Sequence, residues 1–426
     1  MRVLAPILLV LCSFLHAETY YSDPEKGKNE YDGSAKAPWG SLEDVVKAGQ
    51  LKKLKGGDTL LLRSGDHGDV HIRGDNDEFI VIAAEKGQTP RLARFVIESG
   101  KKWRVSGLTV SSSFAKKPYK GWMVELAEAG AGSEIVFENS YVYSVLDTTK
   151  WSAKDWMSCS SGILLGRRGT NLTLRNNYVL NTRFGVAADS PNSMVEGNVI
   201  TDYSADGVRV TRDGITAQYN VIKNCYVSAK DGDDNHDDGI QVFLFNKGTG
   251  TVRDLTIKGN MIVSHEDPKQ PFMHPMQGLG FFDGPLVNFL VEGNVICSET
   301  WHGVALYDAQ GCKILNNACW CPPNPDIKCR PWVMLGTKQK QVKPNTVKDN
   351  LACSFNFKAD SGVTAENNKI ATEETFKKKQ DELRKTIDEK YGKYHPVAKF
   401  ARLGKDTAES EKTAALPVTT EHASPK

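Results

Sequence analysis

The chain has 426 residues, of which 54 are Lys or Arg and 52 are Asp or Glu, so its formal net charge is only +2. This balance neither requires nor excludes an anionic partner. The sequence contains no dense basic patch with interleaved aromatic residues, so we expect no nucleic-acid partner.

The first 17 residues predict a secretory signal peptide. Arg2 precedes an apolar run from Leu4 to Leu15, and the small residue Ala17 ends the segment. The run is too short to span a bilayer, and nothing later in the sequence resembles a membrane helix. We therefore expect a secreted or periplasmic monomer with no membrane span.

The mature N-terminus predicts a cap for a repeat structure. A helix is expected from about Ser41 to Leu54, followed by a strand from Asp58 to Leu62. The first coil of a solenoid would expose its apolar end, and an amphipathic helix can cover that end.

Two short patterns repeat together through the middle of the chain. The first is SGILLG, FGVAAD, DGVRVT, DGIQVF, QGLGFF and HGVALY, with glycine at positions 162, 185, 207, 239, 278 and 303. The second aligns Asn177, Asn198, Asn220, Asn260, Asn294 and Asn317. A period of about 22 to 25 residues with two strand-like pieces predicts a solenoid. We expect an all-β fold, a right-handed parallel β-helix, with handedness taken from the usual crossover of parallel strands.

Alternation of period two predicts which side chains form the core. The residue after each glycine should point inward, which gives a ladder of Ile163, Val186, Val208, Ile240, Leu279 and Val304. We interpret the aligned asparagines as structural: they tolerate left-handed backbone at a turn and can hydrogen-bond to their copies on neighbouring coils.

The expected organisation is a β-helix over residues 18–370, a charged segment over 371–403 and a tail over 404–426. Glu373 to Tyr391 is expected to be helical, and the tail is polar, lacks aromatic residues and is expected to be disordered.

Eight of the nine cysteines follow the signal segment, an even number that is compatible with disulfides in an exported protein. Cys312, Cys319, Cys321 and Cys329 form a cluster whose spacing lacks the paired CxxC units of a zinc site. One or two local disulfides are expected there, with a pairing that the sequence does not define.

The N-terminal strings DGS…APWGSLEDVV and GGDTLLLRSGDH, together with the repeats, resemble secreted right-handed parallel β-helix proteins of the pectate-lyase-like superfamily. The resemblance covers roughly Thr19 to Lys369. It implies the fold and, as a class of activity, a polysaccharide lyase.

Insertions interrupt the repeat at the same position in several coils. Residues 224–237 and 264–277 enter after an asparagine strand and before a glycine strand, and an earlier insertion starts at Thr148. Insertions in the same phase emerge on the same side of a solenoid, so we expect them to form the walls of one groove.

Polar and aromatic residues gather on the rungs beside these insertions, as in a groove for an extended polysaccharide. β-Elimination on a uronic-acid polymer needs a group that neutralises the carboxylate, a base for the C5 proton and an acid for the leaving oxygen. The candidate neutralisers are Arg183, Arg209, Arg212 and Gln241. The candidate bases are His236, His274 and His302, which titrate near neutrality, and Tyr307 is a candidate acid. Further candidate substrate contacts are Phe243, Gln277 and Phe282.

The acidic run around Asp238 has two further interpretations. Asp234 and Asp237 are candidate ligands for Ca²⁺, which many β-helix lyases use to neutralise the substrate carboxylate. Asp206 and Asp238 occupy the same corner of consecutive rungs, and a pair of carboxyl groups is the equipment of glycoside hydrolysis.

Family motifs support uronate chemistry without selecting one reaction. ADGVRV and DDGIQV are similar to strand starts in polygalacturonase-type hydrolases, which would place catalysis on Asp206, Asp237 and Asp238, although the Gly-His-Gly and Arg-x-Lys elements of that family are absent. Asp234 to Asp237 resembles the Asp-Pro-His-Asp/Glu core of mannuronan C5-epimerases, with Asn235 in place of proline. The signatures of pectate lyase proper, Trp-x-Asp-His and Arg-x-Pro-x-x-Arg, are also missing.

The sequence therefore predicts a lyase that acts on an acidic polysaccharide. Arg209 and Gln241, with Ca²⁺ as a further candidate, would neutralise the carboxylate, His236 would be the base, and Tyr307 or His302 the acid. The runner-up is a hydrolase that uses Asp206 and Asp238. The remaining alternatives are a uronan C5-epimerase and a glycan-binding β-helix without activity.

Overall fold

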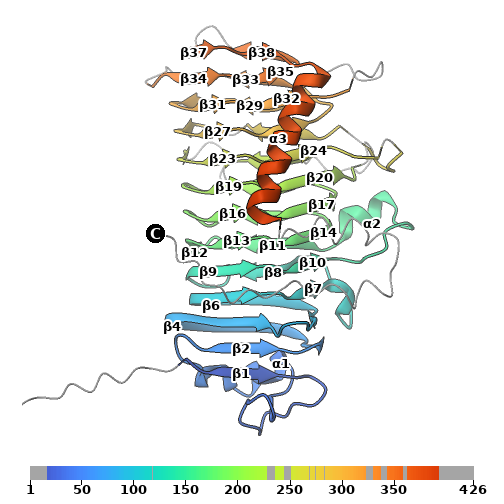
Figure 1. The fold of residues 1–426 in the computed structure, drawn as a ribbon, viewed down its shortest axis with the longest axis vertical. Helices are drawn as coiled ribbons and strands as arrows, with labels where there is room; N and C mark the ends of the chain where they lie inside the picture. Colours follow the sequence, from blue (N-terminus) through green and yellow to red (C-terminus); the bar gives the residue numbers. More distant parts are fainter. Residues whose placement is uncertain are drawn as a thin grey trace, which may run out of the picture.

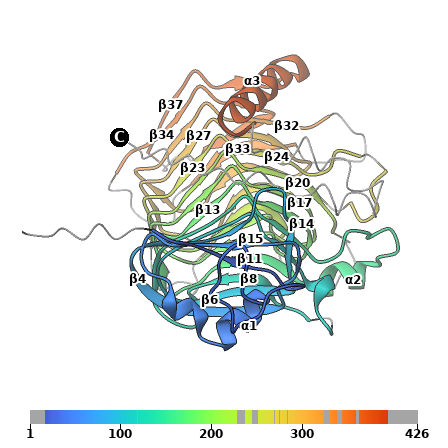
Figure 2. The same cartoon turned by 60° about the horizontal axis from the view of Figure 1, so that its bottom comes forward.

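The computed structural model describes residues 17–117, 119–227, 236–243, 251–267, 269–273, 275–282, 284–322, 330–336, 343–357 and 362–392. The expected signal peptide, apart from Ala17, and the expected tail over 404–426 lie outside these ranges. Figure 1 shows stacked coils along one long axis, and Figure 2 shows the same stack tilted so that its N-terminal end comes forward. Strands pair with the equivalent strands of neighbouring coils.

The coils contribute strands to three faces, and the strand pairings between coils are parallel in the described part of the chain. Face one contains the first parts of β4 (Asp69–Ala84) and β6 (Arg94–Ser106), then β8 (Trp122–Leu126), β11 (Ser161–Leu165), β15 (Val186–Ala188), β18 (Val208–Val210), β21 (Asp238–Val242), β25 (Gln277–Phe281), β29 (His302–Leu306), β33 (Trp332–Leu335) and β36 (Ser354–Phe357).

Face two starts at the N-terminal end of the solenoid and includes the later parts of β4 and β6. Its other strands are β1 (Thr19–Ser22), β2 (Thr59–Leu62), β9 (Gly132–Glu138), β12 (Gly169–Thr170), β13 (Thr173–Arg175), β16 (Met194–Glu196), β19 (Thr216–Gln218), β23 (Thr256–Lys258), β27 (Leu290–Glu292), β31 (Lys313–Leu315), β34 (Asn345–Lys348) and β37 (Val363–Glu366).

Face three is a sheet of twelve strands, and a small sheet of three strands lies at the turn between faces one and two. Face three contains β3 (Gly65–Asp66), β5 (Pro90–Leu92), β7 (Thr109–Ser111), β10 (Tyr141–Tyr143), β14 (Tyr178–Thr182), β17 (Val199–Tyr203), β20 (Val221–Cys225), β24 (Met261–Val263), β28 (Val295–Cys297), β32 (Ala318–Trp320), β35 (Leu351–Ala352) and β38 (Lys369–Ile370). The small sheet contains β22 (Val252–Arg253), β26 (Leu286–Val287) and β30 (Ala309–Gln310).

The expected two strands per coil are therefore three, because the asparagine element bends. In LTLRNNYVL the bend falls at Asn176, which has φ of +55°, so β13 ends before it and β14 begins after Asn177. The residue before each ladder asparagine carries the left-handed backbone, as in Gly197 and Tyr219. The expectation that the ladder asparagines adopt this conformation is wrong by one residue.

The ladder asparagines are buried and hydrogen-bonded from coil to coil. Asn198 donates from both its backbone N and its Nδ2 to Oδ1 of Asn220, each at 3.0 Å. Asn220 repeats this pair of bonds to Asn260, and its Nδ2 also donates to the Val195 carbonyl at 2.9 Å. The ladder runs two coils further than the sequence alignment, through Asn350 and Asn368. Its structural role is confirmed.

The inward ladders on face one are also confirmed. Ile163, Val186, Val208, Ile240, Leu279 and Val304 are fully buried. Burial of each such side chain contributes about 1.5 to 3 kcal/mol. The repeat glycines allow this packing, because a Cβ on Gly207 would lie only 2.4 Å from Cγ2 of Ile222 on face three.

The N-terminal end is covered by α1 (Leu42–Lys47), whose Leu42 and Val45 are fully buried in the main core. The helix is shorter than the expected span to Leu54. Gly49 has φ of +74° and separates α1 from a 3-10 helix at Gln50–Lys53. A second 3-10 helix occupies Ser112–Phe114.

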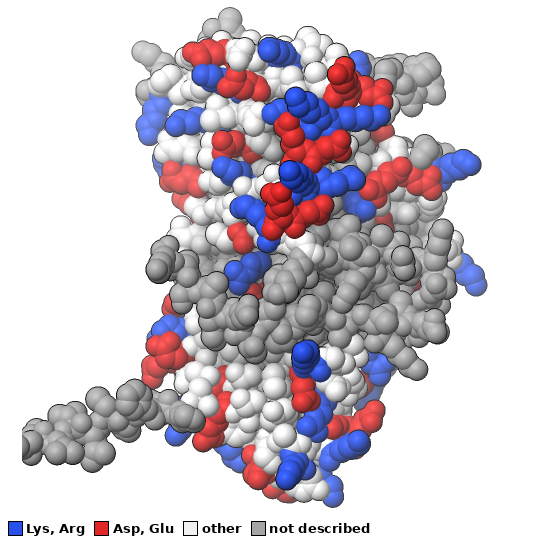
Figure 3. Space-filling view, viewed as in Figure 1, with Lys and Arg blue, Asp and Glu red and all other residues white. Residues whose placement is uncertain are grey.

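The expected C-terminal helix is present as α3 (Glu373–Tyr391) and lies along the outside of face three. Its Phe376, Leu383 and Ile387 pack with Trp320 and other apolar residues of β24, β28 and β32. Figure 3 shows positive and negative side chains interspersed on its outer surface. No helix within the described ranges is both long and apolar enough to cross a membrane.

The seven cysteines that the structure describes are all free thiols. Cys312 and Cys319 are fully buried in the solenoid core, where they pack as small apolar side chains. The local disulfides expected for this cluster are therefore not formed among the described cysteines, and Cys329 lies outside the described residues.

Candidate functional site

The candidate site is built on the residues that directly precede the repeat glycines on face one. We call Asp206, Asp238, Gln277 and His302 the corner column. Consecutive members lie on consecutive coils: Gly207 N–H donates to the Asp238 carbonyl at 2.9 Å, and Asp238 is in register with Gln277. Trp332, at the start of β33, is in register with His302 and extends the column by one coil.

The insertions lie together at the edge where face three turns into face one. The first carries α2 (Ala153–Ser158), and its Trp156 stacks on Tyr226 with ring centroids 4.3 Å apart. Gln270 in the third insertion donates to the carbonyl of Cys225 at 2.8 Å. The three insertions therefore contact the same edge, as expected, although residues 228–235 lie outside the described residues.

Asp206 is fully buried, and both of its carboxylate oxygens are hydrogen-bonded. One oxygen accepts from Nε of Arg209, and the other accepts the backbone N–H of Asp238 at 3.1 Å. The Arg209 guanidinium lies 3.9 Å from the ring centroid of Phe184 and 5.3 Å from that of Phe243. Asp206 and the two rings fix Arg209 in one orientation, with 21% of its side chain exposed.

Asp238 is fully buried, and neither carboxylate oxygen has a hydrogen-bond partner in the described part of the chain. Burial, followed by the nearby carboxyl groups of Asp206 and Asp237, raises its pKa well above the ordinary value, while Arg209 and the Gln241 amide oppose the shift. The raised pKa favours the protonated form of Asp238. An unsatisfied buried carboxyl group costs stability, which is a feature of functional positions.

The space around this carboxyl group exists because position 280 is glycine. A Cβ there would lie 2.3 Å from Oδ1 of Asp238 and 2.6 Å from the ring of Phe282. The absence of a side chain at Gly280 thus leaves room for both the Asp238 carboxyl group and the Phe282 ring beside it.

Two histidines and a tyrosine surround Phe282. The Phe282 ring centroid lies 5.3 Å from that of His236, 5.1 Å from that of His302 and 5.3 Å from that of Tyr307. The Gln277 side chain bridges the two imidazoles. Nδ1 of His302 donates to Oε1 of Gln277 at 2.5 Å, and Nε2 of Gln277 lies 3.5 Å from Nδ1 of His236. The corner column therefore joins the acid pair to a chain of proton-transfer groups.

The Gln277 contact determines the proton position on His302. An amide oxygen only accepts hydrogen bonds, so Nδ1 carries the proton, and Nε2 accepts the Tyr307 hydroxyl at 2.8 Å. Burial and the charge of His236 lower the pKa of His302 to about 4, and burial raises the pKa of Tyr307. At neutral pH His302 is uncharged and Tyr307 retains its proton.

Two of the candidate arginines contact other groups. Arg183 donates to the carbonyl of Met157 and thereby holds the α2 insertion. Arg212 is placed near Asp189, whose pKa it lowers against the larger effect of burial. Gln241 and Phe243 lie at the acid pair, whereas candidate His274 falls outside the described residues.

The calcium expectation rests on Asp234 and Asp237. Asp237 is buried next to Asp238, but Asp234 lies outside the described residues. Within the described ranges no group of three His, Cys, Asp or Glu side chains could hold a metal ion. Because Asp234 lies outside these ranges, calcium stays a prediction.

The sequence analysis missed the aromatic continuation of the column. Trp301 is 53% exposed, and its ring stacks on that of Trp332 with centroids 5.8 Å apart. The Trp332 ring centroid lies 6.0 Å from that of His302. A further rung could have been recognised in the string PWVMLG, but the insertion before it, with its cysteines and prolines, hides the repeat.

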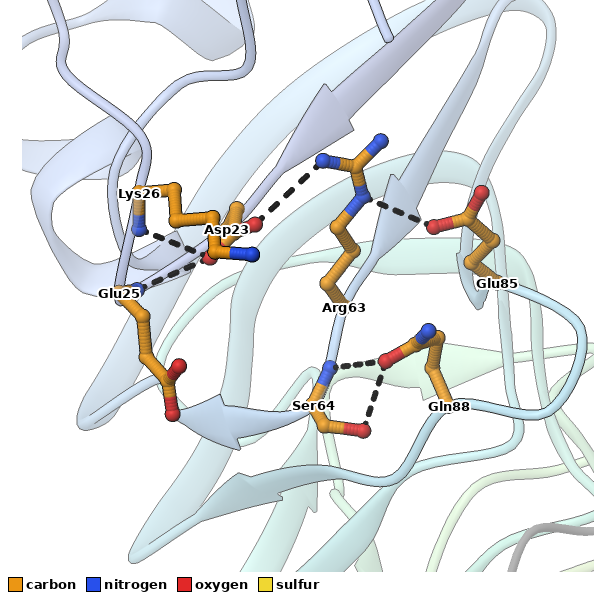
Figure 4. Close-up of a pocket in the computed structure, with 7 residues that line it drawn as sticks. All are labelled: Asp23, Glu25, Lys26, Arg63, Ser64, Glu85 and Gln88. Atoms are coloured by element: carbon orange, nitrogen blue, oxygen red, sulfur yellow. Dashed lines mark hydrogen bonds and ion pairs between the residues drawn. The ribbon is translucent and has the colours of Figure 1, made fainter. Parts of the chain in front are cut away.

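A separate cavity of about 410 Å³ lies near the N-terminal cap (Figure 4). Arg63 sits between Glu85 and Asp23, with nitrogen–oxygen distances of 2.9 Å and 3.4 Å. Ser64 donates from its backbone N and its hydroxyl to the Gln88 side chain. The cavity contains none of the candidate site residues, and its central charges are paired with one another.

Comparisons with known proteins address the fold. Residues 95–266 match the family described as a right handed beta helix region. The solved complex of XylC with xylose superposes with a TM-score of 0.53 at 9% identity, covering 78% of this chain and 75% of that one. The A-module of Azotobacter vinelandii mannuronan C-5 epimerase AlgE6 gives 0.47 at 16% identity, covering 78% and 89%. Pectate lyase Pel9A gives 0.45 at 12% identity, covering 82% and 79%.

A search of curated proteins finds no significant match to the sequence. The family match, together with the parallel coils, confirms the right-handed parallel β-helix expected from the sequence. Since the identities to solved structures are low, these likenesses concern the fold alone.

Proposed function

We propose that the protein cleaves a uronic-acid-containing polysaccharide by β-elimination in a groove along the corner column. The observation that carries the proposal is the buried Asp238, whose pKa is raised and whose carboxyl oxygens have no hydrogen-bond partner within the described ranges, next to the chain of His236, Gln277, His302 and Tyr307. β-Elimination requires a neutralised carboxylate, a base and an acid within one bound sugar unit, and this cluster supplies the three kinds of group.

The carboxylate of the substrate would bind at Arg209, Gln241 and Asp238. Arg209 is held in place by Asp206 and carries a permanent positive charge. A protonated Asp238 donates a hydrogen bond that a charged one could not, either directly or through one bridging water. Together these donors would stabilise the extra negative charge that develops when the C5 proton leaves.

His236 is the proposed base. Its ring is exposed, and its Nδ1 lies 3.5 Å from Nε2 of Gln277. In this scheme the exposed ring faces the bound sugar unit. His236 takes the C5 proton, the electron pair forms the C4–C5 double bond, and the bond from C4 to the leaving oxygen breaks.

Tyr307 is the proposed acid. Its raised pKa keeps the hydroxyl proton in place at neutral pH, whereas His302 is neutral, with its remaining proton directed at Gln277. Rotation about the C–O bond of Tyr307 would move that proton from His302 to the leaving oxygen. His302 is a positioning residue in this scheme.

The hydrolase alternative is less well supported. It requires two carboxyl groups that both reach the substrate or its attacking water. The two oxygens of Asp206 are occupied by Arg209 and by the backbone N–H of Asp238. A C5-epimerase would share the proton abstraction and differ in the fate of the leaving oxygen.

The test is incubation of the purified mature protein with alginate, polygalacturonate and hyaluronan, with Ca²⁺ and with a chelator. Unsaturated uronate ends are followed by their ultraviolet absorbance. We expect a signal that falls about 100- to 10,000-fold in His236→Ala, the range for loss of an acid–base catalyst. Arg209→Ala should also lower the rate strongly.

The matched control is Asp189→Asn. Asp189 is also a buried acid on face one with a raised pKa, but it hydrogen-bonds to Thr211 at the other end of the strands. Its variant should retain the wild-type rate. New reducing ends without ultraviolet absorbance would replace the lyase by the hydrolase, and exchange of the C5 proton without cleavage would indicate an epimerase.

A further inference from the structure

An exposed pair of tryptophans continues the corner column beyond the proton-transfer groups. Trp301 directly precedes His302, and Trp332 is in register with His302 on the next coil. The two rings are stacked, with an interplanar angle of 20°. They lie on the same edge as the candidate site and not in a separate part of the molecule.

The exposure of Trp301 is unusual for this chain. Within the described residues only four large apolar side chains are exposed, and Trp301 is the only tryptophan among them. A tryptophan side chain that stays half in water leaves a large apolar surface unburied, which costs free energy unless a ligand covers it. The ring is therefore available for a contact that the folded chain does not itself provide.

The backbone holds this ring rigidly. The Trp301 carbonyl accepts the N–H of Gly303 at 3.0 Å and the N–H of Trp332 at 2.8 Å. Trp332 covers one part of the Trp301 side chain and contacts His302 in turn. An aromatic platform fixed in this way loses little conformational freedom when a ligand stacks on it.

We propose that Trp301 and Trp332 form a sugar-binding subsite that stacks on a pyranose ring of the polysaccharide, one coil beyond His302. This inference rests on the proposed function, because it takes the ligand to be a chain that runs along the corner column. Trp332 lies three coils from Asp238, roughly 14 Å at about 4.8 Å per coil. The platform thus binds a sugar unit separate from the one at the acid pair.

The chemistry of the platform indicates a pyranose. The C–H groups on one side of a sugar ring form an apolar patch that matches an indole face, while its hydroxyl groups stay in water. The stack carries no charge, so it can bind a neutral unit as readily as a uronate. Selection for uronate would then come from Arg209 and Asp238, and the platform would set the minimum chain length.

The experiment measures binding separately from cleavage. Native gel electrophoresis in gels containing alginate, polygalacturonate or hyaluronan, and quenching of tryptophan fluorescence by defined oligosaccharides, report the affinity of each variant. We expect Trp301→Ala to raise Kd about tenfold, as for loss of one aromatic contact. Trp301→Phe should recover much of the affinity, because it restores a ring.

The matched control is Tyr31→Ala, which removes another exposed aromatic ring, located in the N-terminal cap. It should leave Kd unchanged. With long oligosaccharides, Trp301→Ala should raise KM with little change in kcat, whereas with chains too short to reach the platform it should match the wild type. His236→Ala should instead lower kcat with little change in KM, with long and short chains alike.

The outcomes separate the two proposals. Binding that depends on Trp301 in a protein that releases no unsaturated product would support the platform and remove the lyase. Lyase activity with equal Kd, KM and product sizes in Trp301→Ala and the wild type would overturn the platform. Absence of binding to every polymer of the panel would overturn it as well.

Discussion

The asparagine ladder and the corner column are built by the same repeat, yet they differ in how their polar groups are satisfied. In the ladder every coil supplies the same residue, and each amide bonds to the next. In the corner column the residue type changes from Asp to Gln to His along the coils, and the Asp238 oxygens have no hydrogen-bond partner in the described part of the chain. Both lie at corners of the coil and both are largely buried.

The comparison indicates what each column contributes. A buried network with all its partners stabilises the fold, and a network with missing partners costs stability. The corner column and the adjacent Arg209 place an acid with a raised pKa, a charged arginine and the neutral His302 close together, which a structural column has no need to do. We therefore expect changes in the ladder to affect stability and changes in the corner column to affect activity.

The largest effect is expected at Asp238. Asp238→Ala removes a hydrogen-bond donor to the substrate carboxylate, and we expect the lyase rate to fall about 100- to 1000-fold. Asp238→Asn keeps a neutral donor at the same place, so it should lose only about tenfold. The measurement is the initial rate of ultraviolet absorbance, together with the thermal midpoint of each variant.

This pair of variants distinguishes the role of the carboxyl group. If Asp238 served as a charged base or as the acid of a hydrolase, Asn would abolish activity as fully as Ala. Equal losses in the two variants would contradict the proposed role. The thermal midpoint of Asp238→Asn should stay at or above that of the wild type, because the variant removes a buried ionisable group.

A smaller effect, on stability, is expected in the ladder. Asn220→Ala deletes the bonds to Asn198, Asn260 and the Val195 carbonyl and leaves two buried donors of Asn198 without an acceptor. We expect a loss of about 3 kcal/mol in the free energy of unfolding, measured by chemical denaturation. Asn76→Ala, at a half-buried asparagine on β4 that lies outside the ladder, is the control and should change stability much less. A stable Asn220→Ala protein would contradict the structural role of the ladder.

The smallest effect is a pH dependence at His302. Its pKa falls from 6.5 to about 4 on folding, so between these values the unfolded chain binds a proton that the folded one does not. Stability contributed by this group is present above pH 6.5 and is lost as the pH falls toward 4. Because the side chain is partly exposed, solvent reduces the effect.

The measurement is the thermal midpoint of the wild type and of His302→Gln across this pH range. The raised pKa of Asp238 gives a slope of opposite sign in both proteins, since its proton is lost from the folded state only as the pH rises. The informative quantity is therefore the difference between the two curves. Parallel curves would show that His302 does not titrate differently in the folded and unfolded states.

Much of the fold could be predicted because the same residue types return at equivalent positions of the repeat. Glycine returns wherever two faces approach too closely for a Cβ, and asparagine returns wherever the coil turns from face two to face three. The alignment missed the bend before each asparagine, because the residue with left-handed backbone varies among Asn, Gly and Tyr. It also missed the later rungs, where insertions separate the copies.

The candidate site was predicted less completely. The repeat register placed Asp206, Asp238, Gln277 and His302 in one column, because residues at equivalent repeat positions must lie on neighbouring coils. The register could not reveal that Arg183 binds the α2 insertion, since side-chain partners across an insertion have no fixed sequence spacing. The rung that carries Trp332 was missed because the insertion before it hides the repeat.

The sequence by itself determined the solenoid, its inward ladders and the column on which the site lies, because periodicity in the chain becomes stacking in space. Only the tertiary structure decided which members of the column are paired. Asp206 and Asp238 stand at identical repeat positions and are both fully buried, but Asp206 bonds to Arg209, whereas the carboxyl oxygens of Asp238 have no hydrogen-bond partner within the described ranges. The residue three positions later on the same strand is Arg209 in one case and Gln241 in the other. The strand pattern supplies these two residues, but only the packing of the side chains decides which of them forms an ion pair.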